Sequence, residues 1–141
     1  MISVTRRRAR EVVVQMLYAD DLNPQRNQAE ADEFLRRRLH RDPTVTPFAQ
    51  DLVAGVRRNR EAIDAALQRQ AANWSLARMA AIDRNILRLG AYELLHTQTP
   101  PAVVINEAVE IAKRYGGQNS APFVNGILDR LNPHRRRKQP E

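Results

Sequence analysis

Residues 81–96, AIDRNILRLGAYELLH, are the stretch that decides the fold. Apolar side chains recur along it at helical spacing, as Ile82, Ile86 and Leu89 show, and further leucines cover its other sides. A helix that is apolar on nearly every side has to be covered by several neighbouring elements. We therefore predict one long helix, ending near His96, at the centre of the molecule.

Helical spacing continues outward from this centre in both directions, whereas the alternation typical of strands is almost absent. Clusters of proline, glycine and asparagine divide the chain into segments. Besides the central helix, we expect helices over about 5–21, 28–41, 47–70, 101–115 and 121–131, and a short turn after Ser75. The prediction is an all-α fold of six or seven helices, in two halves that meet near Trp74, where the indole packs.

Local signals indicate where these helices begin and end. Thr46 and Ser120 are expected N-caps, and Pro47 suits the first helical position after Thr46. Gly116 and Gly117 are expected to end the preceding helix because glycine accepts a positive φ.

Length and composition restrict the class of protein. The 141 residues suit one domain, which we place at 1–133, followed by a basic and disordered tail at 134–141. The chain has no cysteine, which excludes disulfides and thiolate metal sites and favours a cytoplasmic location. No apolar run approaches the roughly 18 residues that cross a bilayer, so we expect no membrane association.

Four arginines lie within the first ten residues, namely Arg6, Arg7, Arg8 and Arg10. They continue into a helical pattern that reaches Tyr18. On a helical wheel the apolar side chains of this segment share one side, while Arg7 and Tyr18 gather on the other, Arg8 lies just beyond them, and Arg6 falls near the apolar side. Since residues 11–133 carry 15 basic and 15 acidic side chains, the net charge of +7 belongs to the two ends. A basic cluster beside an exposed aromatic ring favours single-stranded nucleic acid, although a merely solvated helix start is the alternative.

A second binding region is expected where two helices meet. Lys113, Arg114 and Tyr115 end one helix, and residues 116–120 lead into the free N–H groups of the next, which suits an anion or is a plain interhelical turn. Phe123 follows this loop on the edge of an apolar stripe, where it serves either the core or base stacking.

The sequence contains no recognisable catalytic constellation, so we predict a non-enzymatic protein without cofactor or metal. The three histidines, His40, His96 and His134, are not spaced as metal ligands. Glu110 is explained by pairing with Lys113 or Arg114, and Glu107 has no evident partner.

Asp83 and Arg84 interrupt the apolar central helix. Because a buried charge needs a partner, they are either an exposed edge of this helix or part of an internal network of ion pairs.

Several segments together resemble the NusB family of transcription antitermination factors. They occur in the family's order across about residues 5–131, and the set is specific although no single piece is decisive. The matching segments are RRRARE at 6–11, QMLY at 15–18, FAQDLVAGV at 48–56, DRNILRL at 83–89, YEL at 92–94, VINEAVEIAK at 104–113 and FVNGILD at 123–129.

The resemblance implies two small helical bundles around a long central helix, and no catalysis. It implies binding of the boxA element of ribosomal RNA leaders together with the ribosomal protein NusE, and support of ribosomal RNA synthesis with other Nus factors and RNA polymerase. By position, the RNA-binding residues are Arg6, Arg7, Arg8, Arg10, Tyr18, Asn119 and Phe123, and Asp83 falls in the segment that meets NusE. The family often has an acidic residue where Gln118 or Asn119 stands, so the lost charge is expected to favour RNA.

Three points remain open from the sequence. The alternative function is a helical protein-interaction adaptor with only nonspecific affinity for nucleic acid. Members of the family are found as monomers and as dimers, so a homodimer is possible, and the run from Arg135 to Lys138 matches no motif of the family.

Overall fold

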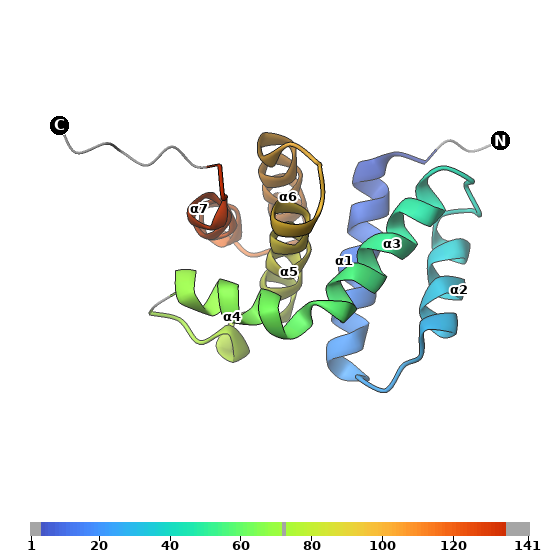
Figure 1. The fold of residues 1–141 in the computed structure, drawn as a ribbon, viewed down its shortest axis with the longest axis horizontal. Coiled ribbons are helices and arrows are strands. Elements are labelled where there is room, and N and C mark those ends of the chain that lie inside the picture. Colours follow the sequence, from blue (N-terminus) through green and yellow to red (C-terminus); the bar gives the residue numbers. More distant parts are fainter. Residues whose placement is uncertain (1–3, 72, 135–141) are drawn as a thin grey trace.

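The computed structural model describes residues 4–71 and 73–134. Within these ranges there are seven α-helices, one short 3-10 turn and no strand (Figure 1). The helices are α1 (Arg6–Leu22), α2 (Gln28–Arg38), α3 (Val45–Arg58), α4 (Arg60–Gln70), α5 (Ala81–His96), α6 (Pro101–Tyr115) and α7 (Ser120–Leu131), and the turn η1 (Leu76–Arg78) precedes α5. The predicted all-α fold is confirmed.

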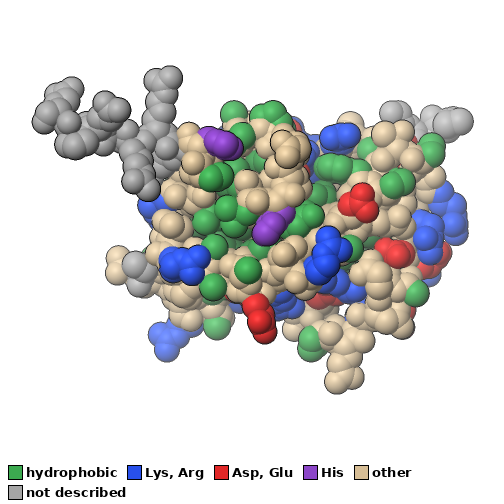
Figure 2. Space-filling view, in the orientation of Figure 1, with side chains coloured by type: hydrophobic (Ala, Val, Ile, Leu, Met, Phe, Trp, Pro, Cys, Tyr) green, Lys and Arg blue, Asp and Glu red, His purple; other side chains and the backbone are tan. Residues whose placement is uncertain are grey.

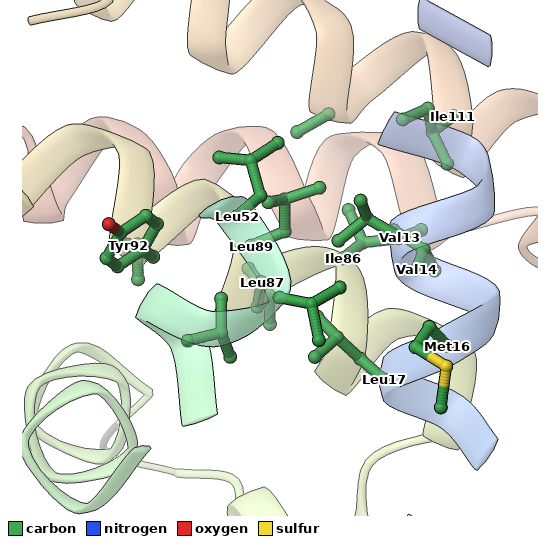
Figure 3. Close-up of a cluster of buried hydrophobic side chains, with 14 of the residues drawn as sticks. Val13, Val14, Met16, Leu17, Leu52, Ile86, Leu87, Leu89, Tyr92 and Ile111 are labelled. Atoms are coloured by element: carbon green, nitrogen blue, oxygen red, sulfur yellow. The ribbon is translucent and has the colours of Figure 1, made fainter. Parts of the chain in front are cut away.

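Helix α5 lies at the centre, as its sequence predicts. Ten consecutive residues, 85–94, are buried, and α1, α3, α4, α6 and α7 all pack against this helix. Helices α1–α3 lie on one side of it and α4 and α7 on the other, while α6 overlaps α5 in this view (Figure 1) and packs against both α5 and α7. Figure 3 shows how side chains of α1, α3 and α6, such as Val13, Leu52 and Ile111, meet the apolar side chains of α5.

The predicted helix over 47–70 is in fact two helices, because α3 and α4 separate at Asn59. The side-chain amide of Asn59 donates to the carbonyl of Gly55 at 2.8 Å, a local bond that competes with helix continuation. The two halves of the molecule therefore join between α3 and α4. The expected join at Trp74 is wrong, since its side chain is 62% exposed.

Two helix ends also differ from expectation. Thr46 is buried inside α3 and is not its N-cap; the carboxylate of Asp42 instead accepts from the backbone N–H groups of Thr44 and Val45. Helix α2 ends at Arg38 and not near Arg41, because His40 and Arg41 adopt positive φ angles of 55° and 54°.

Helix α6 ends at Gly116 as predicted, but for another reason. The φ angle of Gly116 is −88°, so this position does not require glycine for a left-handed backbone conformation. A Cβ at this position would lie 2.7 Å from the carbonyl oxygen of Ala112 and would overlap Ser120. Ser120 is the first residue of α7 and not its N-cap, and its hydroxyl accepts from the N–H of Gly117 at 2.9 Å.

Charged side chains form separate patches on the face shown in Figure 2. Lys and Arg side chains appear at the upper edge near the start of α1 and at the side formed by α2 (Figure 2). None of the helices in the described ranges has the length and apolar character needed to cross a bilayer. The predicted tail from Arg135 onward lies outside the described residues.

Candidate nucleic-acid interface

The arginines of α1 lie in the first two turns of a capped helix. The hydroxyl of Thr5 accepts from the backbone N–H of Arg8 at 3.0 Å, which fixes the start of the helix. No acidic residue lies in this first turn, and three arginines do. Cations are unfavourable at a helix N-terminus because of the helix dipole, so helix stability does not account for these residues.

Arg7 faces α6 and pairs with Glu107. Its Nε and Nη2 donate to the two carboxylate oxygens at 2.7 and 3.0 Å. This bond lowers the pKa of Glu107 below its ordinary value and raises that of Arg7, so both groups stay charged at neutral pH. Glu107, which lacked an evident partner in the sequence, therefore orients a guanidinium whose side chain is still 47% exposed.

Glu11 connects Arg8 to the end of α6. Its carboxylate is buried and accepts from Arg8 on one oxygen and from Arg114 on the other, both at 3.1 Å. Arg114 thus pairs across helices and not within α6, whereas Lys113 pairs with Glu110 as expected. We name the exposed cations held in this way the basic surface: Arg7, Arg8, Lys113 and Arg114.

Arg10 lies elsewhere. It is only 4% exposed, and its Nε and Nη2 donate to Glu93 of α5 at 2.9 and 2.8 Å. The expected direct contact of Arg10 with RNA does not fit this buried position. Arg6 is exposed, but its guanidinium lies 4.6 Å from the ring centre of Phe48, in agreement with its place near the apolar side of the helical wheel.

The aromatic and loop residues predicted for the interface lie toward the far end of α1 and α6. The pairs Arg7–Glu107 and Glu11–Arg114 show that the two helices run side by side in the same direction. Tyr18 is 41% exposed about 10 Å further along α1 than Glu11. Asn119 is exposed in the turn after α6, and Phe123 is partly buried in the first turn of α7.

Asp83 and Arg84 belong to different environments. Arg84 is part of an internal network: it donates to Asp21 of α1 at 3.1 and 3.2 Å and to the carbonyls that end η1. Asp83 is half-buried, and its Oδ1 is buried without a hydrogen-bond partner in the described structure. The internal network therefore holds Arg84, while Asp83 borders the surface.

No group of three or more histidines, aspartates or glutamates within residues 4–71 and 73–134 is arranged to hold a metal ion. The arrangement is one of oriented cations, exposed rings and amide side chains, which suits binding of a polyanion.

The NusB family model matches residues 7–133, which is most of the chain. The chain belongs to the NusB family. The transcription antitermination protein NusB of Bdellovibrio bacteriovorus is 44% identical over 128 residues, which cover 89% of this chain and 93% of that protein. The NusB protein of Trichlorobacter lovleyi is 46% identical over 127 residues and covers 89% of each.

Solved NusB structures share the fold. The NusB structure from T. maritima superposes with a TM-score of 0.84 at 38% identity, over 94% of each chain. A crystal structure of the antitermination factors NusB and NusE in complex with dsRNA contains a chain with a TM-score of 0.80 at 27% identity, over 90% of this chain and 95% of that one. The function is that of a transcription antitermination factor, and NusB proteins are not enzymes.

Sequence reasoning missed the carboxylates that organise this NusB interface. Glu11, Glu93 and Glu107 each fix an arginine of α1, and two of these partners lie 83 and 100 residues away. Only the spacing of Arg8 and Glu11 within α1 carries a local signal, as an i,i+3 pair.

Proposed function

We propose that this chain binds the boxA element of ribosomal RNA leaders together with NusE, and so supports ribosomal RNA transcription in the cytoplasm. Other Nus factors and RNA polymerase would join indirectly. The observation that carries the proposal is the placement of Arg6, Arg7 and Arg8 at a helix N-terminus, where they oppose the helix dipole. The relative solved with NusE and dsRNA supports the choice of partners.

The cations would bind phosphates, and the aromatic and amide side chains would contact bases. Arg7, Arg8, Lys113 and Arg114 already lie against carboxylates that orient them, which lowers the entropic cost of binding. Tyr18, Asn119 and Phe123 offer rings and an amide toward one end of this surface, where unstacked bases can be recognised. Arg6 remains a candidate for a phosphate contact, and we assign Arg10 to positioning α1.

The test is a titration of the full chain with boxA RNA and with a scrambled RNA of equal length. Arg7→Ala should weaken binding of boxA RNA several-fold, whereas Arg58→Ala, which removes an exposed arginine of α3, should not. Equal affinity for the two RNAs would support the alternative, a protein-interaction adaptor with only nonspecific affinity for nucleic acid.

Asp83 is the proposed contact with NusE. Asp83→Lys should weaken association with purified NusE, while Asp51→Lys, a charge reversal at an exposed position of α3, should not. Normal complex formation by Asp83→Lys would remove this residue from the interface.

A further inference from the structure

Trp74 is the only tryptophan of the chain, and it is 62% exposed. Tryptophan is usually well buried, because its ring gains more than most side chains from leaving water. An exposed indole in a well-packed molecule therefore calls for a binding role, since it contributes little to the core.

The connector that carries Trp74 is held in place. The side-chain amide of Gln68 donates to the carbonyl of Trp74 at 2.8 Å and accepts from the N–H of Leu76 at 2.8 Å, so it spans the segment from α4 to η1. The N–H of Trp74 also donates to Ala71 at 2.9 Å. The backbone of Trp74 is consequently held at both its N–H and its carbonyl, which reduces the entropy lost when a ligand binds.

Trp74 stands at the wall of a surface cavity of about 450 Å³. Its ring meets that of Phe123 edge to face, with 6.3 Å between centres and 77° between planes. In this arrangement the edge contact leaves a face of the indole free of Phe123. The rest of the lining comes from Arg78, Met79, Ala80, Asp83 and the loop from Gly117 to Ser120.

The lining favours a neutral aromatic group over a phosphate. The Asp83 carboxylate repels an anion, whereas aromatic side chains accept a flat ring by stacking. The guanidinium of Arg78 belongs to the same lining and offsets the charge of Asp83, so the charged side chains of the lining supply no net positive charge for a phosphate. The loop that lines the cavity comes shortly after Lys113 and Arg114 of the basic surface. A single RNA strand can therefore contact the basic surface and the cavity together.

We propose that one unstacked base of the bound RNA enters this cavity and stacks on the indole of Trp74. The inference rests on the proposed function and adds to it a base-binding site that includes Trp74.

The test uses the tryptophan fluorescence of the full chain, excited at a wavelength that tyrosine does not absorb, so that it reports Trp74 alone. Saturation with boxA RNA should quench the emission. Trp74→Ala should weaken RNA binding about 5- to 150-fold, the range that stacking on one aromatic side chain supplies, and Trp74→Phe should retain most of the affinity. Leu22→Ala is the matched control, because it truncates another exposed apolar side chain, and it should bind normally. Thermal unfolding checks that each variant is folded.

Unchanged emission together with normal RNA affinity of Trp74→Ala would overturn the inference and leave the proposed function in place. Quenching by NusE alone, with loss of NusE binding and not of RNA binding in Trp74→Ala, would overturn it in favour of a protein surface. No binding of boxA RNA by the unaltered chain would overturn the proposed function and this inference with it.

Discussion

At the scale of single residues, the most deeply buried ion pair made by α1 joins Arg10 to Glu93 of α5. Two hydrogen bonds join them, and Arg10 also lies 5.1 Å from the ring centre of Phe48. Desolvation of two charges is costly, so such a pair adds little net stability compared with an apolar pair, but loss of one partner leaves the other charge buried alone.

Arg10→Ala should therefore lower the free energy of unfolding by about 3–5 kcal/mol, the cost of breaking a buried pair. Urea denaturation would measure it, with Arg58→Ala as the control at an exposed site. We expect the folded fraction to bind RNA normally. A stable Arg10→Ala protein with weakened RNA binding would instead restore Arg10 to the RNA-binding residues.

The helical wheel predicted the burial of Ala9, Val13, Met16 and Leu17, and this is confirmed. It could not predict the burial of Arg10, because the carboxylate that makes this burial possible belongs to another helix. Periodicity within a segment reports which side of a helix is apolar, and it carries no information on partners far along the chain.

Between helices, α3 and α5 pack tightly at Gly55. A Cβ added there would overlap the ring of Tyr92, whereas one added at Gly90 would meet only the side-chain carbons of Leu128, the nearest at 2.7 Å. At Gly55 the ring of Tyr92 on α5 thus lies directly against the backbone of α3, in the space a larger side chain would fill.

Gly55→Ala should destabilise the protein by about 1–3 kcal/mol, the usual cost of overpacking, and Gly90→Ala should cost less because Leu128 can shift. Urea midpoints of the two variants at equal protein concentration would test the order. A Gly90→Ala variant less stable than Gly55→Ala would show that Leu128 is the more rigid neighbour.

The junction of α1 with α4 and α5 is electrostatic. Burial opposes ionisation of Asp21, but hydrogen bonds from Asn85, Arg88 and Arg84 outweigh it and lower its pKa, and Arg60 of α4 donates to the same carboxylate. A carboxyl whose pKa falls on folding stabilises the protein above its unfolded pKa, near 4, and loses this contribution as the pH drops further.

Unfolding free energy should hence decline below about pH 4. Asp21→Asn should be less stable at pH 7, because three arginines lose a common partner, and its stability should fall less steeply with acid. Thermal melts between pH 3 and 7 would show this. Parallel pH profiles of the variant and the unaltered protein would place the acid sensitivity in other carboxyl groups.

Helix positions were predictable from the sequence, and several helix ends were not. Pro101 and Gly116 bound α6 as expected. The break at Asn59 and the cap supplied by Asp42 depend on single side-chain to backbone bonds, for which several nearby polar residues compete in the sequence.

For the whole molecule, charge should govern RNA affinity through salt. If the cations of the basic surface each neutralise a phosphate of a single strand, the logarithm of the affinity should fall with the logarithm of the salt concentration by about 0.7 per contact. Arg7→Ala should reduce this slope by about 0.7, while Trp74→Ala should lower affinity at every salt concentration and leave the slope unchanged. Titrations at four salt concentrations would separate the contribution of phosphate contacts from that of stacking on Trp74. Equal slopes for Arg7→Ala and the unaltered protein would place Arg7 away from phosphates.

The architecture as a whole was predictable because α5 is apolar on nearly every side and because the NusB-like segments extend over most of the chain. The boundary between the halves was not, since the exposed Trp74 resembles a core residue in the sequence. A large aromatic ring serves packing and binding equally well, and only its surroundings in the fold decide between them.

The place of α5 in the chain also sets the order of assembly during translation. Helices α1, α2 and α3 are synthesised before residues 85–94, so the side of α1 that packs on α5 and the guanidinium of Arg10 lack these partners at that stage. Domains are synthesised from the N-terminus at about 5–20 residues per second, which leaves this half incomplete for several seconds. A nascent chain that pauses before α5 should accordingly remain sensitive to protease and bound by chaperones, and release from both should coincide with the emergence of Glu93.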